Sequence, residues 1–308
     1  MVASFPKGSV SVAALIAALG FAPGVASATA YSFASHEITN SQTQVLSGSV
    51  TIGAGDRSNV NQTTYNGVAG PNGSDTVTRP LPNAVDAGQA YSGPNGLVVP
   101  ENTFTYQAGR SAGLVGLRSD SNTLSGNPYV ATGGTVTSGS GSGTSQVNDV
   151  SEGLVSGGAL GTGDGRNTAN STFKVNVGPG GATLRFSFTD NSALYASTTS
   201  PGDVAQATLG ISYTLLNGSG VVFSYAPDTL NITGSSIGGG PAFEVNPGPI
   251  AFMSGIATLE PGTYNASLRV ESQSNLSSSA TDISEPASLA LVGVGLGAVG
   301  LIRRRKRL

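Results

Sequence analysis

Regular alternation of apolar and polar residues in the second half of the chain is the feature that most constrains its fold. In STFKVNV, residues 171–177, every second residue is apolar, and ATLRFSFTD repeats the pattern after four residues. A period of two places the apolar side chains on one face of a β-strand. Because a Gly/Pro-rich segment, GPGG, joins the two runs, the pattern predicts a β-hairpin with one buried face over residues 172–188.

Two further patterns extend this prediction. LGISYTLL and VVFSY, joined by NGSG, predict a second hairpin, and PGTYNASLRVES predicts a last strand with Tyr264, Ala266, Leu268 and Val270 on one face. No helical periodicity separates these segments. We therefore expect an all-β fold, an antiparallel β-sandwich of the jelly-roll kind, with its strands in residues 172–271.

The first half of the body, residues 29–171, is rich in turn-forming residues. The chain has 45 Gly and 16 Pro and only 10% charged residues, which favours short strands with long turns. Segments such as 53–75 and 132–146 predict long Gly/Ser-rich loops, and short strand candidates lie at 45–52, 97–107 and 111–118. Residues 272–283 predict a flexible, exposed Ser-rich spacer.

Residues that could support catalysis are few. His36 is the single histidine, and its place near the start of the body predicts a solvated side chain. Residues 234–238 match the G-x-S-x-G pattern of serine hydrolases, but no histidine follows and the next residues, Gly239, Gly240 and Pro241, oppose the required helix. We therefore expect no enzymatic activity and no cofactor.

One segment could bind a metal. GTGDGRN, residues 161–167, offers Asp164 and Asn167, with Asp149 and Glu152 nearby in the sequence. Calcium needs six to eight oxygen ligands, usually from several closely spaced carboxylates, so a plain turn is the favoured interpretation and no metal site is predicted. The chain lacks cysteine, which excludes disulfides and thiolate metal sites.

The charges divide unevenly along the chain. Lys7 and the C-terminal run Arg303–Arg307 account for six of its 14 basic residues, which leaves 8 basic against 17 acidic residues elsewhere. An acidic body argues against contact with phosphate backbones, so we expect no nucleic-acid partner.

The N-terminus predicts a secretory signal peptide over residues 1–28. One lysine precedes an apolar stretch from Val10 to Phe21, a Pro-Gly break and a run of small residues. Ala26, Ala28 and Ala30 provide two overlapping small-x-small cleavage patterns. We expect this segment to form the apolar helix of a signal peptide and the body to be exported.

The C-terminal segment, residues 284–308, predicts a short transmembrane helix. Ala287–Ile302 is uncharged, and sixteen helical residues span about 24 Å against a hydrocarbon core of roughly 30 Å. Long basic side chains can extend to the interface to make up the difference. The basic cluster should stay cytoplasmic and act as the membrane stop, which places the body outside. This cluster consists of Arg303, Arg304, Arg305, Lys306 and Arg307.

This order of elements resembles the PEP-CTERM sorting signal of exosortase substrates. Ser284, Glu285 and Pro286 stand where that family has Pro-Glu-Pro, ahead of the apolar helix and the Arg-rich end. The departure is Ser284 in place of the first proline. The resemblance implies a transient inner-membrane anchor in a Gram-negative-type bacterium, cleaved near the motif by an exosortase, after which the body reaches the cell surface or an extracellular matrix.

Three functions follow from these features. The first is a non-catalytic surface or matrix protein, sorted by its tail and associated with exopolysaccharide or biofilm. The second is a β-sandwich that binds carbohydrate or, given Thr-rich segments such as GGTVTSGS with Thr135 and Thr137, ice. The third is a secreted hydrolase that uses carboxylates alone, which requires two of them across a cleft.

Overall fold

The computed structural model describes residues 29–95, 97, 99–106, 114–124, 126–138, 143–156 and 159–279. These residues form a nearly all-β body with one large, mainly antiparallel sheet, which confirms the all-β class. The strands are β1 (Ala30–Tyr65), β2 (Val68–Pro80), β3 (Val85–Ser92), β4 (Val115–Leu124), β5 (Tyr129–Ala131), β6 (Thr135–Ser138), β7 (Ser145–Val155), β8 (Gly161–Asp190), β9 (Ala193–Thr198), β10 (Val204–Asn217), β11 (Gly220–Tyr225), β12 (Ile232–Ile237), β13 (Phe243–Val245), β14 (Ile250–Met253), β15 (Ala257–Leu259) and β16 (Gly262–Ser278), with a helical turn, η1, at Asp228–Leu230.

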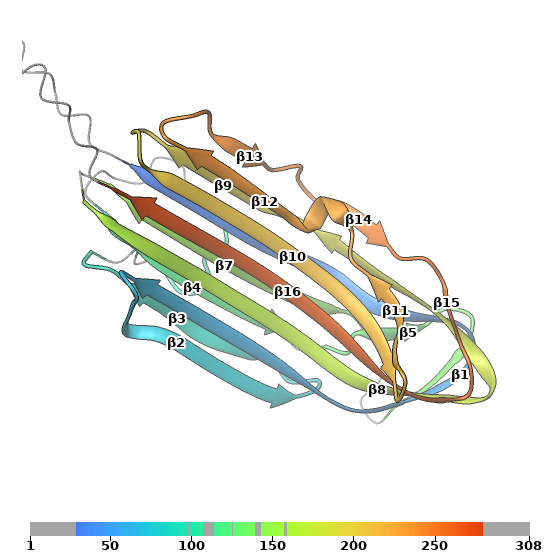
Figure 1. Ribbon diagram of the computed structural model, residues 1–308. Helices are drawn as coiled ribbons and strands as arrows, with labels where there is room; N and C mark the ends of the chain where they lie inside the picture. Colours follow the sequence, from blue (N-terminus) through green and yellow to red (C-terminus); the bar gives the residue numbers. More distant parts are fainter. Residues whose placement is uncertain are drawn as a thin grey trace, which may run out of the picture.

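The sheet follows the order β11-β10-β16-β8-β1-β2-β3-β4-β7, and β7 then pairs again with β1. The long strands run side by side along the molecule, with the shorter β12, β13 and β14 along one margin (Figure 1). Only β5 and β6 are paired in parallel within the described part of the chain, both with β1.

β1 organises this arrangement because its two halves have different neighbours. Residues 30–41 pair with β7 on one edge, and residues 30–35 pair with β9 on the other. Residues 56–65 pair with β2, while β8 accompanies β1 from Ile38 to Tyr65. Several bulges interrupt the β1–β8 register, and such bulges allow so long a strand to bend along its length.

The first predicted hairpin is wrong, because residues 172–188 belong to the single strand β8. Val177 pairs with Val50 and Ala182 with Gly48, so residues 178–181 bulge opposite the lone Ser49. Gly48 and Gly181 have φ angles of +79° and +72°, and a Cβ on Gly48 would lie 2.1 Å from the carbonyl oxygen of Gly181. Glycines on both strands therefore let GPGG form a bulge without reversing the chain.

The other strand predictions in the second half are confirmed. β10 and β11 form a hairpin in which Tyr213 pairs with Tyr225. The alternating residues of PGTYNASLRVES lie in β16 and are buried. The expected spacer at 272–283 is wrong in its first part, however, since β16 continues to Ser278 and buries Leu276.

The loops expected in the first half are largely strands. Residues 53–65 continue β1, and β2 follows a tight turn at Asn66 and Gly67. The candidate at 45–52 lies within β1 and the candidate at 111–118 overlaps the start of β4, whereas the described residues of 97–107 form no strand.

The apolar core lies where β1, β8, β10 and β16 meet. Phe186 stacks on Tyr213 with ring centroids 4.2 Å apart, and the Tyr213 hydroxyl pairs with Thr43 Oγ1 at 2.9 Å. Burial raises the pKa of Tyr213, so its hydroxyl stays protonated.

The interior between residues 57–63 of β1 and the strands β3 and β4 is polar instead. Ser121 donates a hydrogen bond to Asn61 Oδ1 at 2.7 Å, and Arg57, fully buried, donates to the carbonyls of Pro82 and Leu124. Buried polar groups of this kind are stabilised only when they find partners. Because this interior is lined by Asn, Ser and Arg, the period-two apolar pattern is missing from these strands.

The described residues contain no helix with the length and apolar character needed to cross a membrane. The predicted signal peptide at 1–28 and the sorting segment at 284–308 lie outside the described residues.

Candidate cation site

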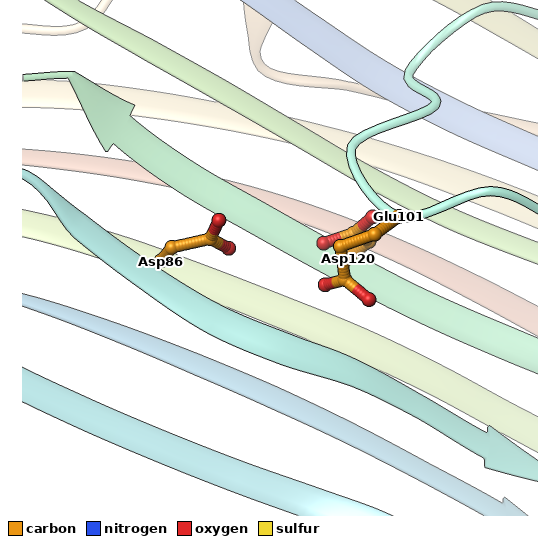
Figure 2. Close-up of side chains that lie close together, drawn as sticks. All are labelled: Asp86, Glu101 and Asp120. Atoms are coloured by element: carbon orange, nitrogen blue, oxygen red, sulfur yellow. The ribbon is translucent and has the colours of Figure 1, made fainter.

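Three carboxylates converge at one place on the described body. Asp86 lies on β3, Asp120 lies on β4, and Glu101 lies on the segment that connects these strands. Each contributes a carboxylate oxygen, and these oxygens all lie within 4.8 Å of one another. Figure 2 shows the three side chains drawn together across the two strands.

The register between β3 and β4 creates this convergence. Asp86 pairs with Asn122, and Asp120 lies two residues before Asn122, so the two aspartates share a face as diagonal neighbours. An irregularity in β3 places Gly88 and Gln89 opposite Asp120. Such bulges redirect side chains, and here the Gln89 carboxamide donates to Asp120 Oδ2 at 3.0 Å.

Backbone hydrogen bonds from the connecting segment and from β3 hold this segment over the face. Asn102 N–H donates to Asp120 Oδ2 at 2.8 Å, and Gln89 N–H donates to Glu101 Oε1 at 3.0 Å. The Asn102 carboxamide also donates to Asp86 Oδ2 at 3.1 Å. Asn102 takes a left-handed conformation with φ of 62°, which asparagine tolerates better than most residues. Glu101 is therefore held over the two aspartates.

Burial and mutual repulsion disfavour the charged carboxylates. Partial burial raises the pKa of Glu101, and the negative charges of Asp120, Asp86 and Asp75 raise it further. Burial also raises the pKa of Asp120, although hydrogen bonds from Gln89 and Asn102 oppose that shift. A positive ion between the carboxylates would relieve both effects.

Two buried oxygens at this site have no hydrogen-bond partner among the described residues. They are Oδ1 of Asp120, which is fully buried, and Oε1 of Gln89, which is 5% exposed. Asp86 and Glu101 are exposed and keep one side open to water. Carboxylate, carboxamide and water oxygens are the ligands that calcium and magnesium take.

The residues that the sequence singled out for calcium do not assemble. GTGDGRN lies inside β8 and is not a turn, which corrects that prediction. Asp164 accepts a weak hydrogen bond from Gln273, and Asn167 pairs with Ser272. Glu152 forms a buried ion pair with Arg118 at 2.6 Å. Asp86, Glu101 and Asp120 were missed because their spacing follows no motif.

His36 is fully buried, so the expected solvated side chain is wrong. Its Nδ1 contacts Asp190, and its backbone N–H donates to Asp149 Oδ1 at 2.8 Å. Ser236 of the G-x-S-x-G match is buried on β12 and bonds to Thr198. The histidine and this serine therefore have separate partners.

A small apolar cavity of about 340 Å³ lies beside Asp190. Leu230, Val245 and Phe252 are among the residues that line it. Among the described residues that line this cavity, Asp190 is the single carboxylate, whereas a carboxylate hydrolase uses two across a cleft.

Of the residues predicted for sorting, only Ala30 is described. It begins β1 and is fully buried. The structure does not describe Ala26, Ala28, the motif at 284–286 or the basic run at 303–307. No protein-family model, no curated protein and no solved structure matches this chain.

Proposed function

We propose that this chain is an exported, non-catalytic cell-surface or matrix protein, sorted through its C-terminal segment by an exosortase. The observation that carries the proposal is where the folded body ends. β1 begins at Ala30, two residues after the predicted signal peptide, and β16 ends at Ser278, six residues before Ser284. Cleavage on either side would leave every described strand intact.

The first strand also favours one of the two signal-peptidase sites. Ala30 is fully buried and pairs with Val155 and Thr198, and the Thr29 backbone N–H donates to Thr199 Oγ1 at 2.9 Å. Cleavage after Ala28 preserves these contacts, whereas cleavage after Ala30 removes them. The mature chain in this proposal therefore starts at Thr29.

The body in this proposal is a jelly-roll-like sandwich with a structural or adhesive role. β16 inserts between β8 and β10, although β10 follows β8 more closely in the sequence, and such crossovers are typical of Greek-key sandwiches. His36, Glu152 and Ser236 are engaged inside the fold, which supports a non-catalytic role. The proposed partners are the exosortase, the inner membrane as a transient anchor, and exopolysaccharide.

The sorting proposal is tested in a bacterium that has an exosortase and in its exosortase-null derivative. The full chain and a variant lacking Arg303–Arg307 are expressed in both, and a Glu285→Ala variant is compared with Glu260→Ala, which removes an exposed carboxylate from the body. We expect a shortened, surface-exposed product only from the intact tail in the exosortase-positive host. A product of the same mass at the surface in every case would overturn the proposal.

One observation favours the alternative of carbohydrate or ice binding. Thr137 on β6 pairs with Thr51 on β1, Thr51 pairs with Asn176 on β8, and Thr263 on β16 donates to Asn176 Oδ1 at 2.8 Å. These neighbours form a row of short polar side chains across four strands, and its three threonines are exposed. Binding to polysaccharide and ice recrystallisation, compared between the full chain and Thr51→Val/Thr137→Val, would test this alternative. Activity that does not depend on these threonines would contradict it.

A further inference from the structure

We propose that Asp86, Gln89, Glu101 and Asp120 bind a calcium ion that fastens the β3–β4 connection to the sheet. This inference is independent of how the chain is sorted, because it rests on the folded body alone. The distances decide whether one ion can reach all three carboxylates. Calcium lies 2.3–2.6 Å from its ligands, so ligands on opposite sides are about 4.6–5.2 Å apart. The carboxylate oxygens lie within 4.8 Å of one another, which one calcium ion can bridge.

The unpartnered oxygens point to a ligand at this place. Asp120 Oδ1 is buried without a hydrogen-bond partner among the described residues, although Oδ2 of the same carboxylate accepts two. Gln89 Oε1 is equally unpartnered, and its carboxamide lies directly against Asp120. A buried acceptor without a partner is costly, and a cation bound to Asp120 Oδ1 would satisfy it, with Gln89 Oε1 proposed as a further ligand.

The local charge balance supports a cation as well. Asp75 adds a fourth negative charge near the site, since its charge acts on Glu101. The positive charge of Arg118 acts on Asp120, but its Nε is bound to Glu152 at 2.6 Å and its Nη1 donates to the Thr103 carbonyl at 2.7 Å. Two of the guanidinium nitrogens of Arg118 thus have other partners, and among the described residues no ion pair joins Arg118 to the three carboxylates.

The ligand chemistry favours calcium over other divalent ions. All four side chains offer oxygen, whereas zinc prefers nitrogen and sulfur ligands. Magnesium requires near-ideal octahedral geometry at 2.0–2.1 Å, which limits opposite ligands to about 4.2 Å and makes a site spread over two strands and a loop less suitable. The exposed faces of Asp86 and Glu101 leave room for water ligands, as in extracellular calcium modules with dissociation constants of about 10⁻⁴–10⁻³ M.

Binding would hold Glu101 against the two strands. Hydrogen bonds through Asn102 and Gln89 already attach the connecting segment. A calcium ion coordinated by all three carboxylates would link Glu101 to both aspartates. We therefore expect calcium to protect residues 99–106 from proteolysis and from hydrogen exchange.

The test uses the full chain purified in mild detergent, with calcium chloride as the probe. Equilibrium dialysis measures binding up to about 10 mM, well above the affinity range of such modules, and circular dichroism measures the unfolding temperature with calcium, with magnesium and with a chelator. We expect one saturable calcium site, a higher unfolding temperature with calcium, and a weaker effect of magnesium. Failure of the wild-type chain to bind calcium saturably would overturn the proposal.

Three variants locate the site. Glu101→Gln and Asp120→Asn keep side-chain size but remove a ligand charge, and Asp164→Asn removes an exposed carboxylate from GTGDGRN as a matched control. We expect the first two to weaken calcium binding at least tenfold and Asp164→Asn to bind as the wild type does. Because each of the first two also removes repulsion, both should unfold in chelator at or above the wild-type temperature. Undiminished binding in both ligand variants, or loss of binding in Asp164→Asn, would refute the assignment.

Discussion

Nδ1 of His36 lies 3.2 Å from both carboxylate oxygens of Asp190, and neither side chain reaches solvent. Asp149 approaches from the other side and accepts the His36 backbone N–H. Burial alone would lower the pKa of His36, but the charge and hydrogen bond of Asp190, with the charge of Asp149, outweigh it and raise that pKa. Burial raises the pKa of Asp149 to about 7, against the opposing effect of His36.

These shifts predict that the protein loses stability as the pH rises. Both groups hold protons more tightly in the folded state, so the unfolded state binds fewer protons and the free energy of unfolding falls with increasing pH. The contribution of Asp149 declines from about pH 4 to about pH 7, and that of His36 declines as the pH rises above about 6.5.

We expect the free energy of unfolding to be lower at pH 8 than at pH 5, with these groups contributing on the order of a few kcal/mol. Urea unfolding in the presence of a chelator measures it without interference from calcium. Asp149→Asn retains an acceptor for the His36 N–H and should flatten the dependence. An unchanged difference between pH 5 and pH 8 in this variant would show that other groups are responsible.

Replacing Arg118 should strongly destabilise the fold. Its Nε bonds to Glu152 Oε2, and both side chains are fully buried. The other carboxylate oxygen, Glu152 Oε1, accepts a hydrogen bond from the Tyr31 hydroxyl at 2.8 Å. Arg118→Met leaves a buried carboxylate without its counterion, which costs about 3–5 kcal/mol.

Chemical denaturation of two further variants separates the charge from the packing. Arg118→Met/Glu152→Gln should recover part of the loss, since neither charge remains buried. Arg269→Met removes one of two cations paired with Glu271, which is partly exposed, and should cost less than about 1 kcal/mol. Equal losses in Arg118→Met and Arg269→Met would contradict the role of burial.

The bulge at residues 178–181 makes Gly48 difficult to replace. Gly48→Ala combines a left-handed backbone with a Cβ 2.1 Å from the Gly181 carbonyl oxygen, so we expect a loss of about 1–3 kcal/mol. Gly180 belongs to the same bulge, but a Cβ there meets nothing within 4 Å, and Gly180→Ala should change stability little. Thermal unfolding of both variants checks this difference. If Gly48→Ala were as stable as Gly180→Ala, the close approach of Gly48 to Gly181 in the bulge would be wrong, and a turn at GPGG would be favoured.

Replacing Leu276 distinguishes the strand that the structure shows at residues 272–278 from the exposed spacer that the sequence predicted. It is 4% exposed and lies close to Gly153 of β7, where an added Cβ would be 2.6 Å from Leu276 Cδ1. Leu276→Ala should cost about 2–5 kcal/mol, as in other well-packed cores, whereas in an exposed spacer it would cost almost nothing. Asn275→Ala, with its side chain on the other face of β16, is the control, and urea unfolding of both proteins measures the change.

The sequence predicted strands at the apolar core, although it divided β8 into a hairpin, and it missed β2, β3 and β7 altogether. Leu209, Ile211, Tyr213 and Leu215 alternate visibly because their partners are apolar. The strand around Leu276 reads as a spacer because the other inward-facing residues there are serines, and Ser274 donates a hydrogen bond to the carbonyl of Ser151 on the distant strand β7. Hydrogen bonding between distant strands leaves no periodic apolar signal.

The candidate cation site illustrates the same limit. Asp86 and Asp120 are 34 positions apart in the chain and become diagonal neighbours only through the β3–β4 register and its bulge. No spacing rule describes such a pair, whereas GTGDGRN attracted attention because its oxygen-bearing residues are adjacent. The sequence could establish only that the body is acidic.

The long first strand has a consequence for the order of folding. Residues 30–41 pair with β7 and residues 30–35 also pair with β9, so their partners lie more than 100 residues later in the chain. Contacts of such high sequence separation form slowly, because a large loop must close first. The start of β1 therefore cannot pair with β7 until about residue 155 has been synthesised, nor with β9 until about residue 198. If the chain is exported as proposed, this delay would help it to stay extended during passage through a secretion channel.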